Sequence, residues 1–140
     1  MSKYVERAME LLDQGHNCAQ SSFIPFCEDE GLDVTMGLKI SSSFGGGIGR
    51  LREACGGFTG ICMACGFKYG YITPTPETKV EYYKLIKKLS DEFIKANGSI
   101  SCKELLGLEK NPNVPLKHSC RDIVINAVEI FEKFMEDMKN

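Results

Sequence analysis

Helix start and stop signals recur along the whole chain and leave little room for strands. Polar residues suited to helix N-caps precede segments that read as helices: Ser2, Asn17, Asp33, Thr75, Ser101 and Ser119. Glycines follow several of these segments, at the place where helices commonly end. We find no convincing strand pattern, internal repeat or low-complexity tract. The sequence therefore predicts an all-α fold, a compact bundle of six or seven helices.

The expected helices alternate with glycine- or proline-rich connections. They cover residues 3–14, 18–30, 34–42, 53–69, 76–96, 102–106 and 120–138. A kink is expected at Pro25 in the second of them. Residues 44–50 are rich in glycine and must form a loop or tight turn, and residues 107–116 form a second loop. Residues 54–67 carry no charge, so we expect them to be the most buried element.

Length and charge narrow the classes of function. The chain of 140 residues is expected to form a single domain, residues 1–140. A net charge of -2 without a cluster of Lys or Arg argues against nucleic acid and anionic membranes as partners. The longest uncharged run is shorter than the roughly 20 residues that span a membrane, so no membrane insertion is expected. Glu6 and Glu10 interrupt the N-terminal segment, which is therefore not a signal peptide, and a cytoplasmic location is expected.

The chain holds seven cysteines, an odd number without a secretory signal. In a reducing compartment such a set points to metal, cluster or thiol chemistry rather than to structural disulfides. The alternative is that a free cysteine is simply a small apolar side chain that suits a protein core. Position along the helices helps to separate these two interpretations.

Four cysteines share a position near the start of an expected helix. Cys18, Cys102 and Cys120 each follow an N-cap residue, and Cys55 is expected in the first turn of the glycine-rich helix. A helix N-terminus has free N–H groups and a partial positive charge of about half a unit, which favours thiolate over thiol. Thiolates are redox nucleophiles and ligands of soft metals and iron–sulfur clusters. We therefore predict these four as catalytic or ligand thiols, with pKa values below about 8.5.

The glycines beside Cys55 point to a close approach by something else. Each glycine at the start of a helix costs up to about 1 kcal/mol relative to alanine. Gly56 and Gly57 are therefore candidates for contact with a cofactor, and close helix packing through Gly56 and Gly60 is the alternative. Cys62 lies seven residues after Cys55, on the same helix face, and is a candidate additional metal ligand.

Other reactive side chains have less pattern around them. Cys27 and Cys65 are expected in the core. Arg52 and the neighbouring Arg50 either stabilise a thiolate or an anionic ligand or lie in solvent. His16 and His118 each precede a key cysteine by two residues, as a base, a spare ligand or an exposed loop residue.

Several motifs together resemble a known family. They are Asn-Cys-Ala-Gln at 17–20, Phe-Gly-Gly-Gly-Ile-Gly-Arg at 44–50, Cys-Gly-Gly-Phe-Thr-Gly at 55–60, Gly-Phe-Lys-Tyr-Gly at 66–70, Ser-Cys-Lys-Glu-Leu-Leu-Gly at 101–107 and Cys120. In this order they resemble the C_GCAxxG_C_C family of "putative redox-active proteins". The resemblance implies that the family's four cysteines are Cys18, Cys55, Cys102 and Cys120. Gly57 stands where the motif has alanine, and the three other cysteines are additional to it.

The resemblance carries expectations about cofactors. The family is similar to the N-terminal part of split-Soret cytochromes, which carry an iron–sulfur centre beside their haems. This similarity implies an all-helical fold and a four-cysteine cluster. No haem is expected, because the chain has no Cys-x-x-Cys-His sequence.

Three functions remain open at this point. The four thiolates hold an iron–sulfur cluster, form a dithiol/disulfide relay, or bind zinc or another soft metal in a structural or trafficking module without redox turnover. The first two would make the protein a thiol or iron–sulfur oxidoreductase with an unidentified electron-transfer partner. The separations of 37, 47 and 18 residues resemble neither a ferredoxin run nor paired zinc motifs. A homodimer is also expected, with a second copy covering the glycine-rich surface.

Overall fold

The N-cap residues predicted from the sequence start helices in the structure. A computed structural model describes residues 1–115 and 119–140. Its right-handed α-helices are α1 (Lys3–Asp13), α2 (Cys18–Phe23), α3 (Val34–Ser41), α5 (Gly56–Tyr69), α6 (Pro76–Asn97), α7 (Cys102–Leu105) and α8 (Cys120–Met138). The described residues contain no strand, and their one β-bridge joins Ala54 and Ser101. The all-α prediction of six or seven helices is therefore confirmed.

Side-chain capping explains where most of these helices begin. The Ser2 hydroxyl accepts a hydrogen bond from the Val5 N–H, and the Ser119 hydroxyl accepts one from Asp122. Asn17 and Gln20 form a reciprocal capping box at the start of α2. Thr75 and Thr78 form a second capping box at the start of α6, and the Asp33 carboxylate accepts from the Met36 N–H at the start of α3. Ser101 is the exception, because its side chain makes no capping hydrogen bond.

Two expected helices differ from the structure in extent. The second ends at Phe23, and Pro25 lies in a 3-10 turn, η1 (Ile24–Phe26), followed by η2 (Glu28–Glu30) and Gly31 with φ 93°. The predicted kink at Pro25 thus becomes the end of the α-helix. The helix expected from residue 53 begins at Gly56, because residues 53–55 pair with residues 100–102 through backbone hydrogen bonds.

The glycine-rich segment 45–48, labelled α4 (Gly45–Ile48), is a turn rather than a regular helix. It follows the 3-10 turn η3 (Ser42–Phe44). Gly46 and Gly47 have φ values of 66° and 69°, in the left-handed region. Ile48, Arg50 and Arg52 also have positive φ, although they carry side chains. A left-handed residue with a Cβ costs roughly 1–2 kcal/mol, so this loop is strained.

The core forms where α2 crosses α5. A Cβ on Gly60 would overlap the Ser22 hydroxyl and lie 2.7 Å from the Ala19 carbonyl oxygen, so α5 presents glycine to α2 at the closest approach. This is the close helix packing that was the alternative to cofactor contact. α5 has seven buried residues, more than any other described element, whereas α2 buries a larger share, four of its six, so the predicted helix is the most buried by number but not by fraction. The C-terminal part of α5 reaches the surface, where Phe67 is 41% exposed.

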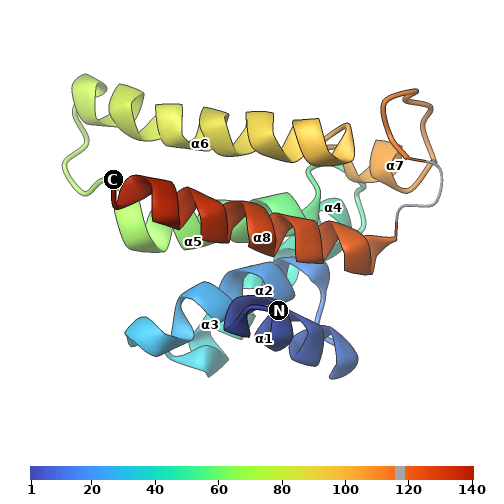
Figure 1. The fold of residues 1–140 in the computed structure, drawn as a ribbon, viewed down its shortest axis with the longest axis horizontal. Helices are drawn as coiled ribbons and strands as arrows, with labels where there is room; N and C mark the ends of the chain where they lie inside the picture. Colours follow the sequence, from blue (N-terminus) through green and yellow to red (C-terminus); the bar gives the residue numbers. More distant parts are fainter. Residues whose placement is uncertain (116–118) are drawn as a thin grey trace.

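The remaining helices surround this pair (Figure 1). α6 and α8 run antiparallel along the long axis, and α1, α2 and α3 lie on the other side of α8. The N-terminal ends of α5 and α8 point to the same end of the molecule as α7 and the glycine-rich turn. No described helix combines the length and apolar character that crossing a membrane requires.

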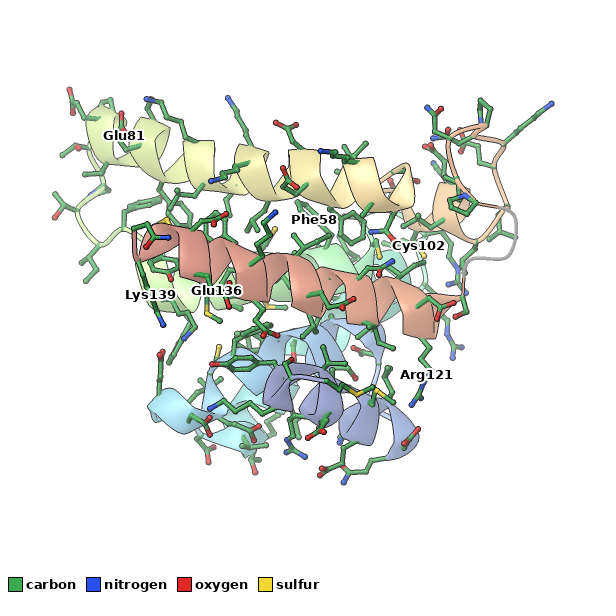
Figure 2. The ribbon with its side chains drawn as sticks, viewed as in Figure 1. Phe58, Glu81, Cys102, Arg121, Glu136 and Lys139 are labelled. Carbon is green, nitrogen blue, oxygen red and sulfur yellow. The ribbon has the colours of Figure 1, made fainter. Side chains whose placement is uncertain are left out.

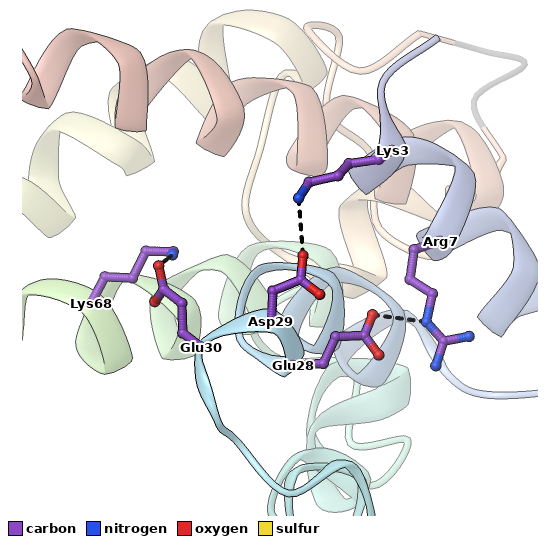
Figure 3. A network of polar contacts seen from close by, with 6 residues as sticks. All are labelled: Lys3, Arg7, Glu28, Asp29, Glu30 and Lys68. Atoms are coloured by element: carbon purple, nitrogen blue, oxygen red, sulfur yellow. Dashed lines mark hydrogen bonds and ion pairs between the residues drawn. The ribbon is translucent and has the colours of Figure 1, made fainter.

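A polar network fastens η2 to its neighbours (Figure 3). Glu28 accepts from Arg7 Nε at 2.9 Å, and Asp29 accepts from Lys3 Nζ at 3.0 Å, both from α1. Glu30 pairs with Lys68 of α5 at 2.7 Å. The three consecutive carboxylates are thus each neutralised by a cation from another element.

Candidate functional site

The four predicted cysteines line one small cavity of about 60 Å³. We call Cys18, Cys55, Cys102 and Cys120 the four-cysteine site. The other residues that line the cavity are Gly46, Arg52, Gly56, Leu105, Leu106 and Ile123. Its lining residues come in part from α7 and the start of α8, at one end of the molecule, where Figure 2 labels Cys102. The structure thus brings together thiols that are far apart in the sequence.

Each thiol is positioned by the start of a different helix. Cys18, Cys102 and Cys120 are the first residues of α2, α7 and α8, as predicted. Cys55 is the N-cap of α5 rather than a residue of its first turn. Its N–H donates to the Ile100 carbonyl at 2.7 Å, and the Cys102 N–H donates to the Glu53 carbonyl at 2.6 Å. These bonds tie α5 and α7 together beside the cavity.

Glycines make room for the sulfur atoms. A Cβ on Gly56 would overlap Cys18 Sγ, so that thiol occupies the space of the missing side chain. A Cβ on Gly47 would lie 2.6 Å from Cys102 Cβ. Gly57, by contrast, does not line the cavity, and a Cβ there would lie 3.4 Å from Ile123 Cγ2 in α8. Alanine, the residue of the family motif, would fit at Gly57.

The four thiols differ in their access to solvent. Cys55 and Cys102 are 6% and 8% exposed, Cys18 is half-buried and Cys120 is exposed. All four are free thiols. The cavity therefore has a buried wall on α5 and α7 and an open side at the start of α8.

Burial opposes the helix N-termini in setting the acidity of these thiols. It raises the pKa of Cys55 to about 12, although the backbone N–H groups of Phe58 and Gly57 act in the opposite direction. Burial also raises the pKa of Cys120, as do nearby Cys18 and Cys102, while Arg52 lowers it. The prediction of lowered pKa values is therefore wrong for Cys55 and Cys120, because an apolar cavity destabilises a thiolate more than a helix end stabilises it.

The other three cysteines lie away from the cavity. Cys27 and Cys65 are fully buried, as predicted for core residues. Burial raises the pKa of Cys27 and of half-buried Cys62 to about 12. Cys62 neighbours Cys65 and Tyr82 instead of the four-cysteine site, so the structure does not place it as an additional ligand.

Of the described histidine and arginine candidates, one lines the cavity and the others lie outside it. His16 is half-buried before α2 and does not line the cavity, and His118 lies outside the described residues. Arg50 is exposed, whereas Arg52 lines the cavity with Nη1 3.7 Å from Cys102 Sγ. The sequence left both arginines open, and the structure assigns the second to the site.

Sequence reasoning missed the apolar lining of the cavity. Leu105 follows Cys102 by three positions and Ile123 follows Cys120 by three, so each lies one helical turn beyond a cysteine. That spacing was the available signal. These side chains exclude water from the buried side of the thiols.

Sulfur is the donor chosen by soft metals and by iron–sulfur clusters, and four thiols fit that chemistry. Within residues 1–115 and 119–140, no three His, Cys, Asp or Glu side chains are arranged to hold a single metal ion. The thiols instead surround a space. Their residue types fit a soft metal or an iron–sulfur cluster.

Comparison with known proteins identifies the family. The family model described as "Putative redox-active protein (C_GCAxxG_C_C)" matches residues 16–134. An uncharacterized protein of Archaeoglobus fulgidus is 29% identical over 151 aligned positions, which cover 98% of this chain and 96% of that protein. No solved structure gives a significant match. The chain belongs to the C_GCAxxG_C_C family of putative redox-active proteins.

Proposed function

We propose that this protein carries electrons at a centre held by the four-cysteine site, with an iron–sulfur cluster as the redox group. One observation carries the proposal: four helices deliver one cysteine each to a single cavity. Those cysteines are separated by 37, 47 and 18 residues in the sequence. Core packing alone gives no reason for four thiols from distant segments to share one space.

The cavity between the thiols supports a cluster over a zinc ion. Zinc binds thiolates at about 2.3 Å in a tetrahedron, which draws the four sulfurs around one atom. A cavity of about 60 Å³ suits a guest of several atoms. When bound, an iron–sulfur cluster supplies one-electron transfer.

The residues around the thiols would shield the cluster from water on one side and leave it accessible to a partner on the other. Leu105 and Ile123 keep water from the buried side, which matters because burial and solvent exposure set cluster potentials. Cys120 is exposed and marks the side on which a partner protein would exchange electrons. We place contact with the electron donor or acceptor there.

The test is the iron and sulfide content of protein purified without oxygen. We expect comparable amounts of iron and acid-labile sulfide, and visible absorbance that bleaches on reduction with dithionite. Replacing any one of the four cysteines with serine should remove most of both elements. Cys27→Ser is the matched control, because Cys27 is buried away from the cavity, and it should retain them. Circular dichroism checks that each variant is folded.

Two other results would overturn the cluster. Protein that takes up no iron and sulfide, but forms dithiothreitol-reversible disulfides among the four cysteines, would be a dithiol relay. Protein that retains zinc and shows no reversible redox change would be the structural or trafficking module. Both contradict the proposal, and mass spectrometry with metal analysis distinguishes them.

A further inference from the structure

The loop before α5 holds residues with side chains in a conformation that favours glycine. Ile48, Arg50 and Arg52 have φ values of 67°, 66° and 61°. Such strain persists only where the surroundings impose it, and it gathers at functional sites. Of these three side chains, Arg52 is the one that lines the four-cysteine site.

Hydrogen bonds on both sides fix the backbone of Arg52. Its N–H donates to the Gly46 carbonyl at 3.2 Å, within the loop. Its carbonyl accepts from the Lys103 N–H at 3.3 Å, at the start of α7. The adjacent Glu53 carbonyl accepts from Cys102. The loop therefore holds Arg52 against the helix that carries Cys102.

The Arg52 side chain is directed to the thiols. Nη1 lies 3.7 Å from Cys102 Sγ and donates to it, and the guanidinium lines the cavity. Among the described residues Arg52 is the one charged side chain that lines the cavity, and none of their carboxylates forms an ion pair with it.

We propose that Arg52 is a positioning residue that provides the counter-charge of the four-cysteine site and raises its reduction potential. This inference rests on the proposed function for the potential, but its charge effect is testable without any cofactor. A cation and an N–H donor at sulfur stabilise the more negative, reduced state of a cluster. They also stabilise the thiolates of a reduced dithiol, which makes a disulfide more oxidising. In both cases the positive charge of Arg52 raises the reduction potential.

The first experiment measures the charge in metal-free, reduced protein. Iodoacetate is anionic and iodoacetamide is neutral, yet both alkylate the same thiolate. The ratio of the iodoacetate rate to the iodoacetamide rate at Cys120 therefore reports the local electrostatic potential. We expect Arg52→Gln to lower this ratio about threefold to fivefold at low salt. Arg52→Lys, which keeps the charge, should largely preserve it. Arg50→Gln is the matched control from the same strained loop and should leave it unchanged.

The second experiment measures the reduction potential of protein purified without oxygen. We expect Arg52→Gln to shift the equilibrium constant of reduction tenfold toward the oxidised state, about 59 mV for a one-electron couple. Arg52→Gly should lower the potential equally while relieving the strained φ, so its thermal midpoint should not fall. A structural role alone would lower that midpoint and leave the alkylation ratio intact.

The two experiments separate two failures. An unchanged alkylation ratio in Arg52→Gln, or equal potentials in wild type and variant, overturns the role of Arg52. A changed ratio in a protein with no redox centre overturns the potential-setting role and the proposed function together, while the counter-charge stands.

Discussion

Cys55 and Cys120 lie in very different surroundings within the same site. Cys55 is 6% exposed beneath α2, whereas Cys120 is at the surface. Solvent access, rather than helix position alone, should therefore set the order in which the thiols react. Helix position alone had given all four thiols the same expected acidity.

We predict that Cys120 is the fastest of the four to react with iodoacetamide in metal-free, reduced protein. Cys55 should be the slowest, because a reagent must enter the cavity and burial raises the pKa of its thiol to about 12. Mass spectrometry of each cysteine peptide at neutral pH measures the order. Equal rates at both thiols would show that the cavity opens freely in solution.

Buried thiols away from the site should make the protein sensitive to alkali. Burial raises the pKa of Cys27 from an ordinary 9.0 to about 12. The folded state therefore retains a proton that the unfolded state loses above pH 9. Stability is complete below that pH and falls as pH rises toward 12, by up to about 1.36 kcal/mol per pH unit for each such thiol.

Cys27→Ala isolates this contribution. The variant's free energy of unfolding should fall less steeply with pH between 9 and 12 than that of the wild type, whatever its stability at pH 7. Urea unfolding at several pH values gives the two slopes. Parallel slopes would mean that Cys27 ionises in the folded protein.

The sequence predicted which cysteines form the site better than it predicted the surroundings of their thiols. N-cap positions and family resemblance were enough to name the cysteines that meet in the cavity. Their acidity depends on burial in a cavity that α2, α5, α7 and α8 form together. Arg52 remained undecided for the same reason, since its charge becomes relevant only once α7 packs beside it.

At the scale of elements, the glycines of α5 divide by what faces them. Gly60 meets α2 at close range, whereas Gly57 faces α8 with space for a methyl group. The sequence predicted the helix and offered both packing and cofactor contact for its glycines. It could not say which glycine served which purpose, because that depends on the rotation of α5 against its neighbours.

We predict opposite effects of alanine at these two positions. Gly57→Ala should stabilise the protein by roughly 0.5–1 kcal/mol through helix propensity. Gly60→Ala should destabilise it by roughly 1–3 kcal/mol, because α2 and α5 must separate. Chemical denaturation of both variants tests the pair. Similar effects would show that α5 is rotated about its axis from the orientation in this structure.

Helix boundaries were less predictable where tertiary pairing competes with helix signals. Residues 53–55 have helix-compatible neighbours, yet they pair with residues 100–102 and leave the start of α5 to Gly56. The pairing partner lies almost fifty residues away. No local sequence pattern predicts this pairing, which brings Cys55 and Cys102 together.

On the scale of the whole molecule, the four-cysteine site connects α2, α5, α7 and α8. A guest held by thiols from all four helices binds the folded chain and not the unfolded one. Part of the glycine-rich surface expected to meet a second copy is packed within the chain, because Gly60 meets α2, whereas Gly49 of the adjacent loop is exposed. The homodimer stays a prediction.

We predict that loading the site raises the stability of the entire protein. A ligand present at a hundred times its dissociation constant adds about 2.7 kcal/mol. Anaerobic thermal unfolding with and without iron and sulfide should show this increase in the wild type and in Cys27→Ser. Cys120→Ser should lose most of it. An equal increase in Cys120→Ser would show that the first turn of α8 takes no part in binding.

The spread of the site along the sequence also fixes when it can mature. During synthesis Cys18 and Cys55 leave the ribosome first, whereas Cys120 and the cavity wall at Ile123 follow only after most of the chain has been made. A nascent chain therefore offers an incomplete set of thiols to any delivery system. On the proposed function, assembly of the centre would follow translation, and its components would enter from the exposed side of the cavity at Cys120.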